Sequence, residues 1–179
     1  MMEELSLHIL DIVENSISAG ASLVEIVLSI DRKKDELSLT ITDNGKGMDE
    51  DMVKNIRDPF FTTRTTRRVG LGVSFLDEIS YLTGGRLEIK STPGKGTVVL
   101  LSLPLSHPDR PPLGDIVSTL MTILVAANDM RFIYREKRDD NEWVFDSADV
   151  IGVSDPVSLK QIGDVLYNSY KEFTGGELI

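Results

Sequence analysis

The stretch Thr42-Asp43-Asn44-Gly45-Lys46-Gly47-Met48 decides the fold that we predict for this chain. It follows a short segment with strand-like alternation, residues 37–42, and precedes an acidic helix start at 49–51. A carboxylate at the end of a strand can accept a hydrogen bond from a ligand. Gly45 and Gly47 let the backbone turn sharply and approach a flat molecule without a Cβ clash. We therefore predict a small-molecule pocket centred on Asp43.

Two other interpretations of this stretch compete with a ligand pocket. Asp-Asn-Gly is also typical of a surface turn, and this stretch alone does not separate the two. A calcium loop needs oxygen ligands at alternating positions and a glutamate at the twelfth position. Counted from Asp43, the third and fifth positions are Gly45 and Gly47, and the twelfth is Lys54. The sequence therefore excludes an EF-hand and leaves the surface turn as the alternative.

Composition narrows the class of protein. A chain of 179 residues forms one domain, or one domain with a sizeable extension, and is long enough for a hydrophobic core. The net charge of −10 argues against nucleic acid or an acidic membrane as partner. The absence of cysteine excludes disulfides, thiolate metal sites and a cysteine nucleophile. Residues 1–4 lack the basic region of a signal peptide, and no apolar run is long enough to span a membrane, so we expect a cytoplasmic protein.

Residues 4–18 have the spacing of an amphipathic helix. One side of this helix carries mostly apolar residues, namely Leu5, Ile9, Ile12, Val13 and Ser16. The other side carries short polar residues at spacings of three and four, namely His8, Asp11, Asn15 and Ser18. A solvated helix surface normally uses long charged side chains, and this side has no lysine or arginine. We therefore predict that the polar side lines a site.

The order of the expected elements predicts the fold class. Strands at 23–30 and 37–42 follow the first helix, and strands at 86–91 and 97–103 follow two further helices, at 49–57 and from 70 to 82. Consecutive strands joined by short turns pair antiparallel. Helices packed on such a sheet give a two-layer α/β sandwich with a mixed, mostly antiparallel sheet.

Between the second and third helices lies a loop of threonines and arginines, residues 58–68, without periodicity. Gly70 and Gly72 then open a helix whose exposed N–H groups and positive dipole suit an anion. A Rossmann fingerprint would need a third glycine where this chain has Phe75. Gly94-Lys95-Gly96-Thr97 lacks the upstream glycine and the following helix of a P-loop. We therefore exclude both motifs.

The linker Pro104–Pro112 holds four prolines and divides the chain into a predicted domain at 1–105 and an extension at 106–179. Residues 113–127 are apolar on most sides, so they must be buried inside the chain or against a partner, for example in a homodimer. A hairpin at 130–145 and a helix that begins at Asp155-Pro156 complete an α-β-β-α extension.

In order and spacing, residues 4–103 resemble the GHKL superfamily, the Bergerat-fold ATP-binding domain of gyrase, heat-shock chaperone, histidine-kinase and mismatch-repair ATPases. Each family motif has a counterpart in this chain. Residues 10–21 resemble the N box, 43–48 the first glycine box, 58–64 the F box of histidine kinases, 70–74 the second glycine box, and Gly96-Thr97 the strand that closes the adenine pocket.

The resemblance implies a role for each matching residue, with ATP and Mg²⁺ as the bound groups. Asn15 would bind Mg²⁺ through its amide oxygen, since this hard cation prefers oxygen ligands and keeps several waters. Asp43 would accept a hydrogen bond from the adenine amino group. Gly47 and Met48 would lie against the ring, and Thr97 would reach the adenine through its hydroxyl or a water.

The loop at 59–69 would be the ATP lid, and the helix that follows would hold the β- and γ-phosphates. Arginines in this loop form a cationic patch suited to phosphates, although a solvated loop is the alternative. The resemblance assigns further residues to nucleotide binding, namely Gly45, Phe60, Thr62, Thr63, Arg64, Arg67, Arg68, Gly70, Leu71, Gly72 and Val73.

The catalytic base is implied by the same resemblance. In hydrolysing members a glutamate four residues before the magnesium asparagine is the general base, and that position here is Asp11. Aspartate can transfer the same proton but is one methylene shorter. Glu14 is the second candidate because it lies on a different side of the helix from Asn15. His8 shares the predicted pocket side and is a weaker candidate for a catalytic role.

The N-box-like helix begins within a few residues of Met1, and the histidines are His8 and His107. We therefore expect no phospho-acceptor domain, no usual autophosphorylation and no transducer domain. The favoured hypothesis is a histidine-kinase-like module that binds Mg-ATP and transfers the γ-phosphate to a partner protein. The alternatives are an ATP-hydrolysing conformational switch that acts on a regulated target, and a non-catalytic nucleotide-sensing scaffold. The motifs do not decide between these hypotheses.

Overall fold

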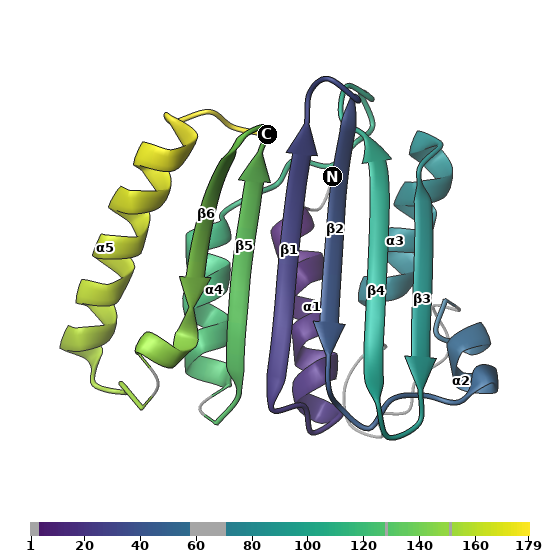
Figure 1. Cartoon of the computed structure of the whole chain (residues 1–179), viewed down its shortest axis with the longest axis horizontal. Helices are drawn as coiled ribbons and strands as arrows, with labels where there is room; N and C mark the ends of the chain where they lie inside the picture. The colour runs from purple at the N-terminus through teal and green to yellow at the C-terminus, as the bar shows by residue number, and fades with distance from the viewer. Residues whose placement is uncertain (1–3, 58–70, 128, 151) are drawn as a thin grey trace.

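The computed structural model describes residues 4–57, 71–127, 129–150 and 152–179. These residues form one sheet with the strand order β3-β4-β2-β1-β5-β6, and α1, α3 and α4 cover one of its faces (Figure 1). The elements are α1 (Leu5–Ser18), β1 (Leu23–Asp31), β2 (Glu36–Asp43), α2 (Glu50–Asn55), α3 (Leu71–Thr83), β3 (Arg86–Thr92), β4 (Gly96–Pro104), α4 (Ile116–Ala126), β5 (Arg131–Arg138), β6 (Asn141–Asp146), the 3-10 turn η1 (Ser147–Asp149) and α5 (Pro156–Thr174).

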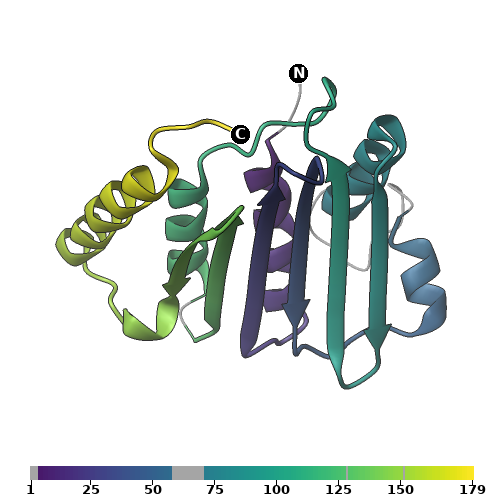
Figure 2. The ribbon, with the colours of Figure 1, turned by 45° about the horizontal axis from the view of Figure 1, so that its top comes forward.

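The sheet is mixed and mostly antiparallel, as predicted. Strand β2 pairs antiparallel with β1 and β4, β3 with β4, and β5 with β6. The one parallel pair in the described sheet joins β1 to β5. Figure 2 shows α1, α3 and α4 side by side behind the strands, while the opposite face of the sheet carries none of these helices. The predicted two-layer α/β architecture is therefore confirmed.

Alternation along the strands explains which face the helices cover. In β1 the side chains of Val24, Ile26, Leu28 and Ile30 are fully or almost fully buried, while the residues between them are half-buried or exposed. The same alternation continues in β2. Because successive side chains of a strand point to opposite faces, every second residue packs under the helices. The apolar core therefore lies between the sheet and the helix layer.

Helix α1 is buried along its apolar side and, at His8, on its polar side as well. Its apolar side packs in the core as expected, with Leu5 and Ile9 fully buried. His8, predicted to face the site, is also buried, and its ring lies 5.8 Å from the ring of Phe75 in α3. Asp11 is exposed. The helix is thus enclosed by the sheet and by α3, because α3 covers the part of the polar side that carries His8.

The apolar segment at 113–127 is buried inside the chain, which is one of the two predicted outcomes. Helix α4 contacts both α1 and α5. Its buried residues are Ile116, Val117, Thr119, Leu120, Ile123 and Leu124. Internal burial accounts for the composition of this segment, and the homodimer through it stays a prediction.

The C-terminal elements continue the sheet of the N-terminal ones. Strand β5 pairs with β1 along eight residue pairs, from Leu23 with Arg131 to Ile30 with Arg138. The linker is also held to α1, because the backbone N–H of Leu5 donates to the Pro112 carbonyl at 2.9 Å. The sheet therefore crosses the boundary predicted between 1–105 and 106–179, and that division stays a prediction.

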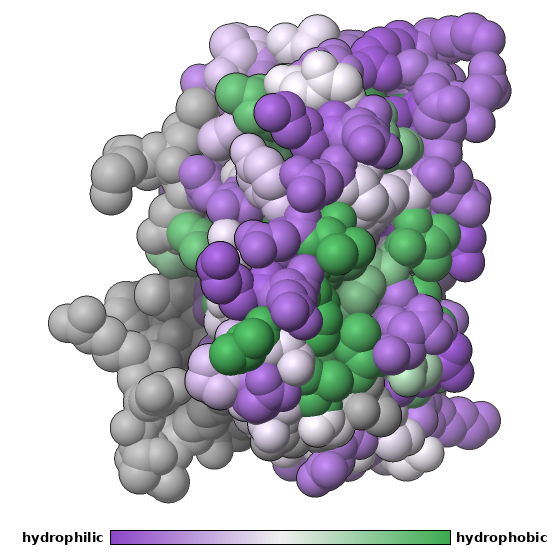
Figure 3. Space-filling view, turned by 90° about the vertical axis from the view of Figure 1, so that its left-hand side faces the viewer, coloured by the Kyte–Doolittle hydropathy of each residue, from purple (hydrophilic) through white to green (hydrophobic). Residues whose placement is uncertain are grey.

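Helix α5 packs less deeply than the other long helices. Leu166 is its buried residue, whereas Val157 and Val165 are mostly exposed. Figure 3 views the molecule from the α5 side and shows apolar side chains among hydrophilic ones on this face. An apolar groove of about 380 Å³ runs between α5 and the segment around η1, with Phe145 and Ile162 in its walls. Few core contacts hold α5, so its polar contacts matter more.

A buried polar network joins α5 to the sheet. The carboxylate of Glu136, which is fully buried, accepts hydrogen bonds from the Tyr134 hydroxyl at 2.6 Å, the Tyr170 hydroxyl at 2.9 Å and Arg138 Nε at 2.7 Å. Burial, with the charge of Glu136 as the next cause, raises the pKa of Tyr170 well above its usual range. Both tyrosines therefore remain protonated donors. The network satisfies the buried charge of Glu136 from three directions.

We predict that Glu136→Ala strongly destabilises the fold. The substitution removes the buried carboxylate of Arg138 and leaves its guanidinium only the longer ion pair with Glu177, at 3.6 Å. Breaking a buried pair costs about 3–5 kcal/mol. Urea unfolding followed by circular dichroism measures this loss. Glu142→Ala is the control, because its ion pair with Arg135 is largely exposed and contributes about 1 kcal/mol or less. Equal unfolding midpoints for the two variants would contradict the proposed role of the network.

We also predict that the whole chain unfolds in one transition, because β1 pairs with β5 across the linker. Trp143, the only tryptophan, reports on the C-terminal elements by fluorescence, while circular dichroism reports on all helices and strands. The two urea midpoints should coincide, as expected for one cooperative unit. Two separate transitions would instead show that the parts on either side of the linker fold independently.

Candidate functional site

A row of polar side chains crosses the sheet where β2 ends. The strand register places Asp43 opposite Thr97, and Thr97 opposite Ser91. Ile41, two residues before Asp43 in β2, and Val99, two residues after Thr97 in β4, are buried under the helices. Because side chains alternate along a strand, the three polar residues share this helix-covered face. Residues directly opposite in antiparallel strands have neighbouring side chains, so the row forms one continuous polar surface.

The carboxylate of Asp43 is held in a fixed orientation. Its Oδ2 accepts a hydrogen bond from Ser16 Oγ of α1 at 2.8 Å, and its Oδ1 accepts one from the backbone N–H of Gly45 at 2.9 Å. A carboxylate has about four acceptor positions, so two donors leave capacity for a ligand. Sequence reasoning placed Ser16 on the apolar side of the helix and missed this contact.

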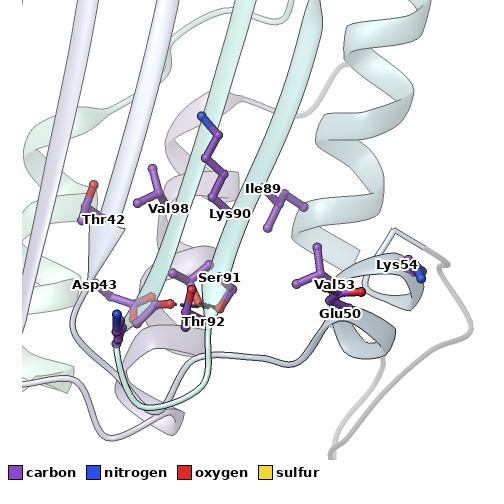
Figure 4. Close-up of a pocket in the computed structure, with 13 residues that line it drawn as sticks. Thr42, Asp43, Glu50, Val53, Lys54, Ile89, Lys90, Ser91, Thr92 and Val98 are labelled. Carbon is purple, nitrogen blue, oxygen red and sulfur yellow. Dashed lines mark hydrogen bonds between the residues drawn. The ribbon is translucent and has the colours of Figure 1, made fainter.

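Ser91 connects the polar row to the loop between β2 and α2. Its Oγ lies 2.8 Å from Thr97 Oγ1 and 2.9 Å from the Gly96 carbonyl, and it accepts a hydrogen bond from the Met48 N–H at 2.8 Å. Figure 4 shows Ser91 beside Asp43 at the end of the sheet. Sequence reasoning did not single out Ser91. Its position two residues after Ile89 in an alternating strand was the available signal.

Close packing of the backbone requires glycine at positions 47 and 96. Gly47 has φ of +66°, and a Cβ there would lie 2.1 Å from the Thr92 carbonyl oxygen. Gly96 has φ of +102°, and a Cβ there would lie 1.9 Å from the Asp43 carbonyl oxygen. A side chain at either position would overlap the backbone of a neighbouring strand. The sequence prediction explained Gly47 by approach to a flat ligand, and the structure adds the close packing of its backbone as a second reason.

The Asp-Asn-Gly stretch is a turn whose side chains are bound within the protein. Asn44 Oδ1 accepts hydrogen bonds from the N–H groups of Ser22 at 2.9 Å and Leu23 at 3.0 Å. The Lys46 N–H donates to the Ala19 carbonyl at 2.9 Å. This turn is therefore fixed against the connection between α1 and β1.

The second predicted group of site residues meets where α1 contacts α3. A Cβ at Gly72 would lie 2.8 Å from the Asp11 Cβ, so the first turn of α3 lies directly against α1. Asn15, which is half-buried, follows Asp11 by one helical turn, a rise of about 6 Å. Val73, predicted to bind the ligand, has its side chain buried in the core with 3% exposed.

The two groups are linked through α1. Asn15 directly precedes Ser16, which donates to Asp43 at the end of the sheet. The same helix therefore places Asp11 beside the start of α3 and Ser16 beside the polar row.

A cavity of about 540 Å³ opens beside the polar row (Figure 4). Its volume is in the range of small-molecule sites. It is lined by Thr42, Asp43, Glu50, Val53, Lys54, Ile89, Lys90, Ser91, Thr92, Lys95, Gly96, Thr97 and Val98. Three lysines and two carboxylates, those of Asp43 and Glu50, are in this set.

Several predicted site residues lie outside the described part of the chain. These are Phe60, Thr62, Thr63, Arg64, Arg67, Arg68, Gly70 and the side chain of Leu71. Except for Val73, which packs in the core, the others fall into the two groups above: Asp43, Gly45, Gly47, Met48 and Thr97 at the end of the sheet, and Asp11, Asn15 and Gly72 at the contact of α1 with α3.

Within the described ranges, no group of three or more acidic or histidine side chains is arranged to hold a metal ion. The described helices also include none with the length and hydrophobicity needed to cross a bilayer.

Comparison with known proteins matches the N-terminal three-fifths of the chain. Residues 3–107 match the family described as histidine kinase-, DNA gyrase B-, and HSP90-like ATPase. The sensor protein DegM of Bacillus sp. (strain B21-2) is 35% identical over 97 residues, which are 54% of this chain and 26% of DegM. The sensor protein kinase FleS of Pseudomonas aeruginosa is 37% identical over 97 residues, 54% of this chain and 24% of FleS. The chain thus spans about a quarter of these relatives.

A solved structure extends the likeness of fold beyond this segment. The N-terminal domain of a DNA repair protein aligns with a TM-score of 0.56 and 20% sequence identity, and covers 79% of this chain and 51% of that one. This coverage includes more of the chain than residues 3–107 and supports the fold. The match to the family model covers more than half of the sequence. The chain therefore belongs to the family of histidine kinase-, DNA gyrase B-, and HSP90-like ATPases, with an ATP-binding domain of the histidine-kinase type.

Proposed function

We propose that this chain binds Mg-ATP and transfers the γ-phosphate to a partner protein. The single observation that carries the ATP site is the oriented Asp43 carboxylate, which Ser16 and Gly45 hold beside Thr97 in one row. The relatives named as sensor proteins support a role in phosphoryl transfer, although this chain covers only about a quarter of each.

The polar row fits the adenine end of ATP. Asp43 offers acceptor capacity to the exocyclic amino group, and Thr97 lies directly opposite it in the neighbouring strand. Met48 follows the tight loop and is tied to the row through Ser91, so its backbone position is fixed. These residues would orient the base, because each is held by a second hydrogen bond or by strand pairing.

The contact between α1 and α3 fits the phosphate end. The first N–H groups of a helix have no partner within it, and the start of α3 therefore favours an anion. Asn15 would supply an amide oxygen to Mg²⁺, which usually takes one or two protein ligands and completes its shell with phosphates and water. Bound Mg²⁺ would neutralise negative charge on the phosphates. The half-buried Asn15, one helical turn after the contact of Asp11 with Gly72, offers one such protein oxygen.

A second candidate function, ATP hydrolysis that drives a conformational switch, is favoured by the position of Asp11. This exposed carboxylate lies against Gly72 at the start of α3, where the phosphates would bind. An aspartate within reach of a water there would act as general base. In transfer to a partner, the accepting group would come from that protein. A non-catalytic nucleotide-sensing scaffold is the third candidate.

We predict that Asn15→Ala weakens Mg-ATP binding at least tenfold, because the cation loses its protein oxygen. Isothermal titration calorimetry with ATP, with and without Mg²⁺, measures the loss, and circular dichroism checks that the fold is intact. Asn168→Ala, at an exposed position of α5, is the matched control and should bind as the parent does. Unchanged affinity in the Asn15 variant would remove this residue from the site.

Labelled ATP and an Asp11→Asn variant distinguish transfer of the γ-phosphate to a partner protein from hydrolysis of ATP. We expect the chain, incubated with γ-labelled ATP in an extract of its source organism, to label one partner protein. We expect slow release of free phosphate by the purified chain, and Asp11→Asn should abolish it, because the amide cannot accept the proton. Free phosphate without a labelled partner would favour the hydrolysing switch, and binding without either product would favour the scaffold.

A further inference from the structure

The apolar groove between α5 and the segment around η1 lies in the part of the chain that the family model does not match. That match ends at residue 107. The apolar residues in the groove's walls are Phe145, Val150 and Val153 from β6 and the segment after it, and Ile162, Val165 and Leu166 from α5. The cavity beside the polar row is lined by residues between 42 and 98 instead. The groove is therefore separate from the proposed nucleotide site.

Side chains of this groove remain partly open to solvent. Val165 lines it from α5 and is 66% exposed, and Val153 and Ile162 are only half-buried. Figure 3 shows the apolar side chains on this face bordered by hydrophilic ones. An exposed apolar surface with a polar border is typical of a protein interaction site. A partner that covered it would gain the free energy of removing apolar surface from water.

The border of the groove is acidic. Residues 145–166 contain four carboxylates and one cation, namely Asp146, Asp149, Asp155, Asp164 and Lys160. Asp146 forms an ion pair with Arg131 of β5, and Asp164 forms one with Lys160 at 3.8 Å. Among the described residues, Asp149 and Asp155 have no ion-pair partner. The carboxylates therefore outnumber the cations that pair with them.

One of these two carboxylates lies on each side of the groove. Asp155 caps α5, and its Oδ1 accepts a hydrogen bond at 2.8 Å from the N–H of Ser158, which lines the groove. This hydrogen bond lowers the pKa of Asp155 from its usual value, so the carboxylate is charged at neutral pH. Asp149 directly precedes Val150 of the opposite wall, and both carboxylates belong to exposed residues. Negative charge thus flanks the apolar walls.

This charge decides between two kinds of occupant. A second copy of the chain would bring the same carboxylates against their counterparts, and like charges repel. A segment that carries lysine or arginine beside apolar residues would fill the groove and place cations near Asp149 and Asp155. Such complementary charge favours both the encounter and the correct partner.

We propose that this groove docks a segment of a partner protein in which basic residues flank apolar ones. The groove belongs to the C-terminal part of the chain, so the inference does not depend on the proposed nucleotide site. It assigns an interaction surface to α5 and the segment around η1, the elements that pack least deeply on the sheet.

Binding of a dye-labelled synthetic peptide to the full chain tests the apolar part of this proposal. The peptide carries leucines flanked by lysines, and fluorescence polarisation measures its dissociation constant. Val165→Gln should weaken binding roughly tenfold, because a polar amide replaces apolar surface that the peptide buries. Val157→Gln is the matched control and should bind as the parent does. Val157 lies on the same helix and is 68% exposed, but it is not among the residues that line the groove.

Asp155→Asn tests the charged part. It should weaken binding roughly threefold, as expected for one exposed ion pair. Asparagine caps a helix about as well as aspartate, so the start of α5 is preserved. Asp115→Asn is the matched control, because Asp115 caps α4 through the Ser118 N–H in the same way and is not part of the groove.

Weaker binding in Val165→Gln and Asp155→Asn, with parent-like binding in both controls, supports the proposal. Equal weakening in Asp155→Asn and Asp115→Asn would show a general attraction to an acidic chain and overturn it. A peptide with serines in place of the leucines that binds equally well, or no saturable binding of the leucine peptide, overturns it too. A parent dimer that Val165→Gln dissociates would assign the groove to a second copy instead. The assay contains no nucleotide, so failure of the proposed function would leave its result unchanged.

Discussion

The hydrogen bond from Ser16 to Asp43 is the interaction on which the site depends. It joins the helix that carries Asp11 and Asn15 to the strand end that carries the polar row, so both groups of site residues share one rigid frame. Its energy as a single hydrogen bond is modest, about 1 kcal/mol. Its importance is geometric, because it sets the orientation of a carboxylate that the Gly45 N–H holds from the other side.

The rest of the fold keeps α1 in place. The sheet buries one side of the helix, α3 covers His8 through Phe75, and α4 contacts it from the C-terminal part of the chain. The C-terminal elements thus support the site without contributing a described residue to the polar row. Their attachment combines parallel pairing of β5 with β1 and the buried network around Glu136. A site on such packed elements is preorganised for a ligand of defined shape.

Local sequence patterns predicted much of the fold and part of the candidate site. Alternation in residues 37–42 identified a strand, and the order of the glycine motifs identified the fold and the position of Asp43 in it. Contacts between distant segments were not predictable in this way. The parallel pairing of β5 with β1 joins residues more than a hundred positions apart, and no turn connects them. His8 fitted the polar side of α1 by spacing, but α3 buries it. Ser16 and Ser91 looked like ordinary helix and strand residues, because their roles come from hydrogen bonds across elements.

A crystal structure of the chain with a non-hydrolysable ATP analogue and Mg²⁺ tests the central claim most directly. The account predicts the adenine amino group within hydrogen-bond distance of Asp43, and the cation on the amide oxygen of Asn15 with the phosphates at the start of α3. An ordered nucleotide bound elsewhere, or no nucleotide beside Asp43 at saturating analogue, would contradict it.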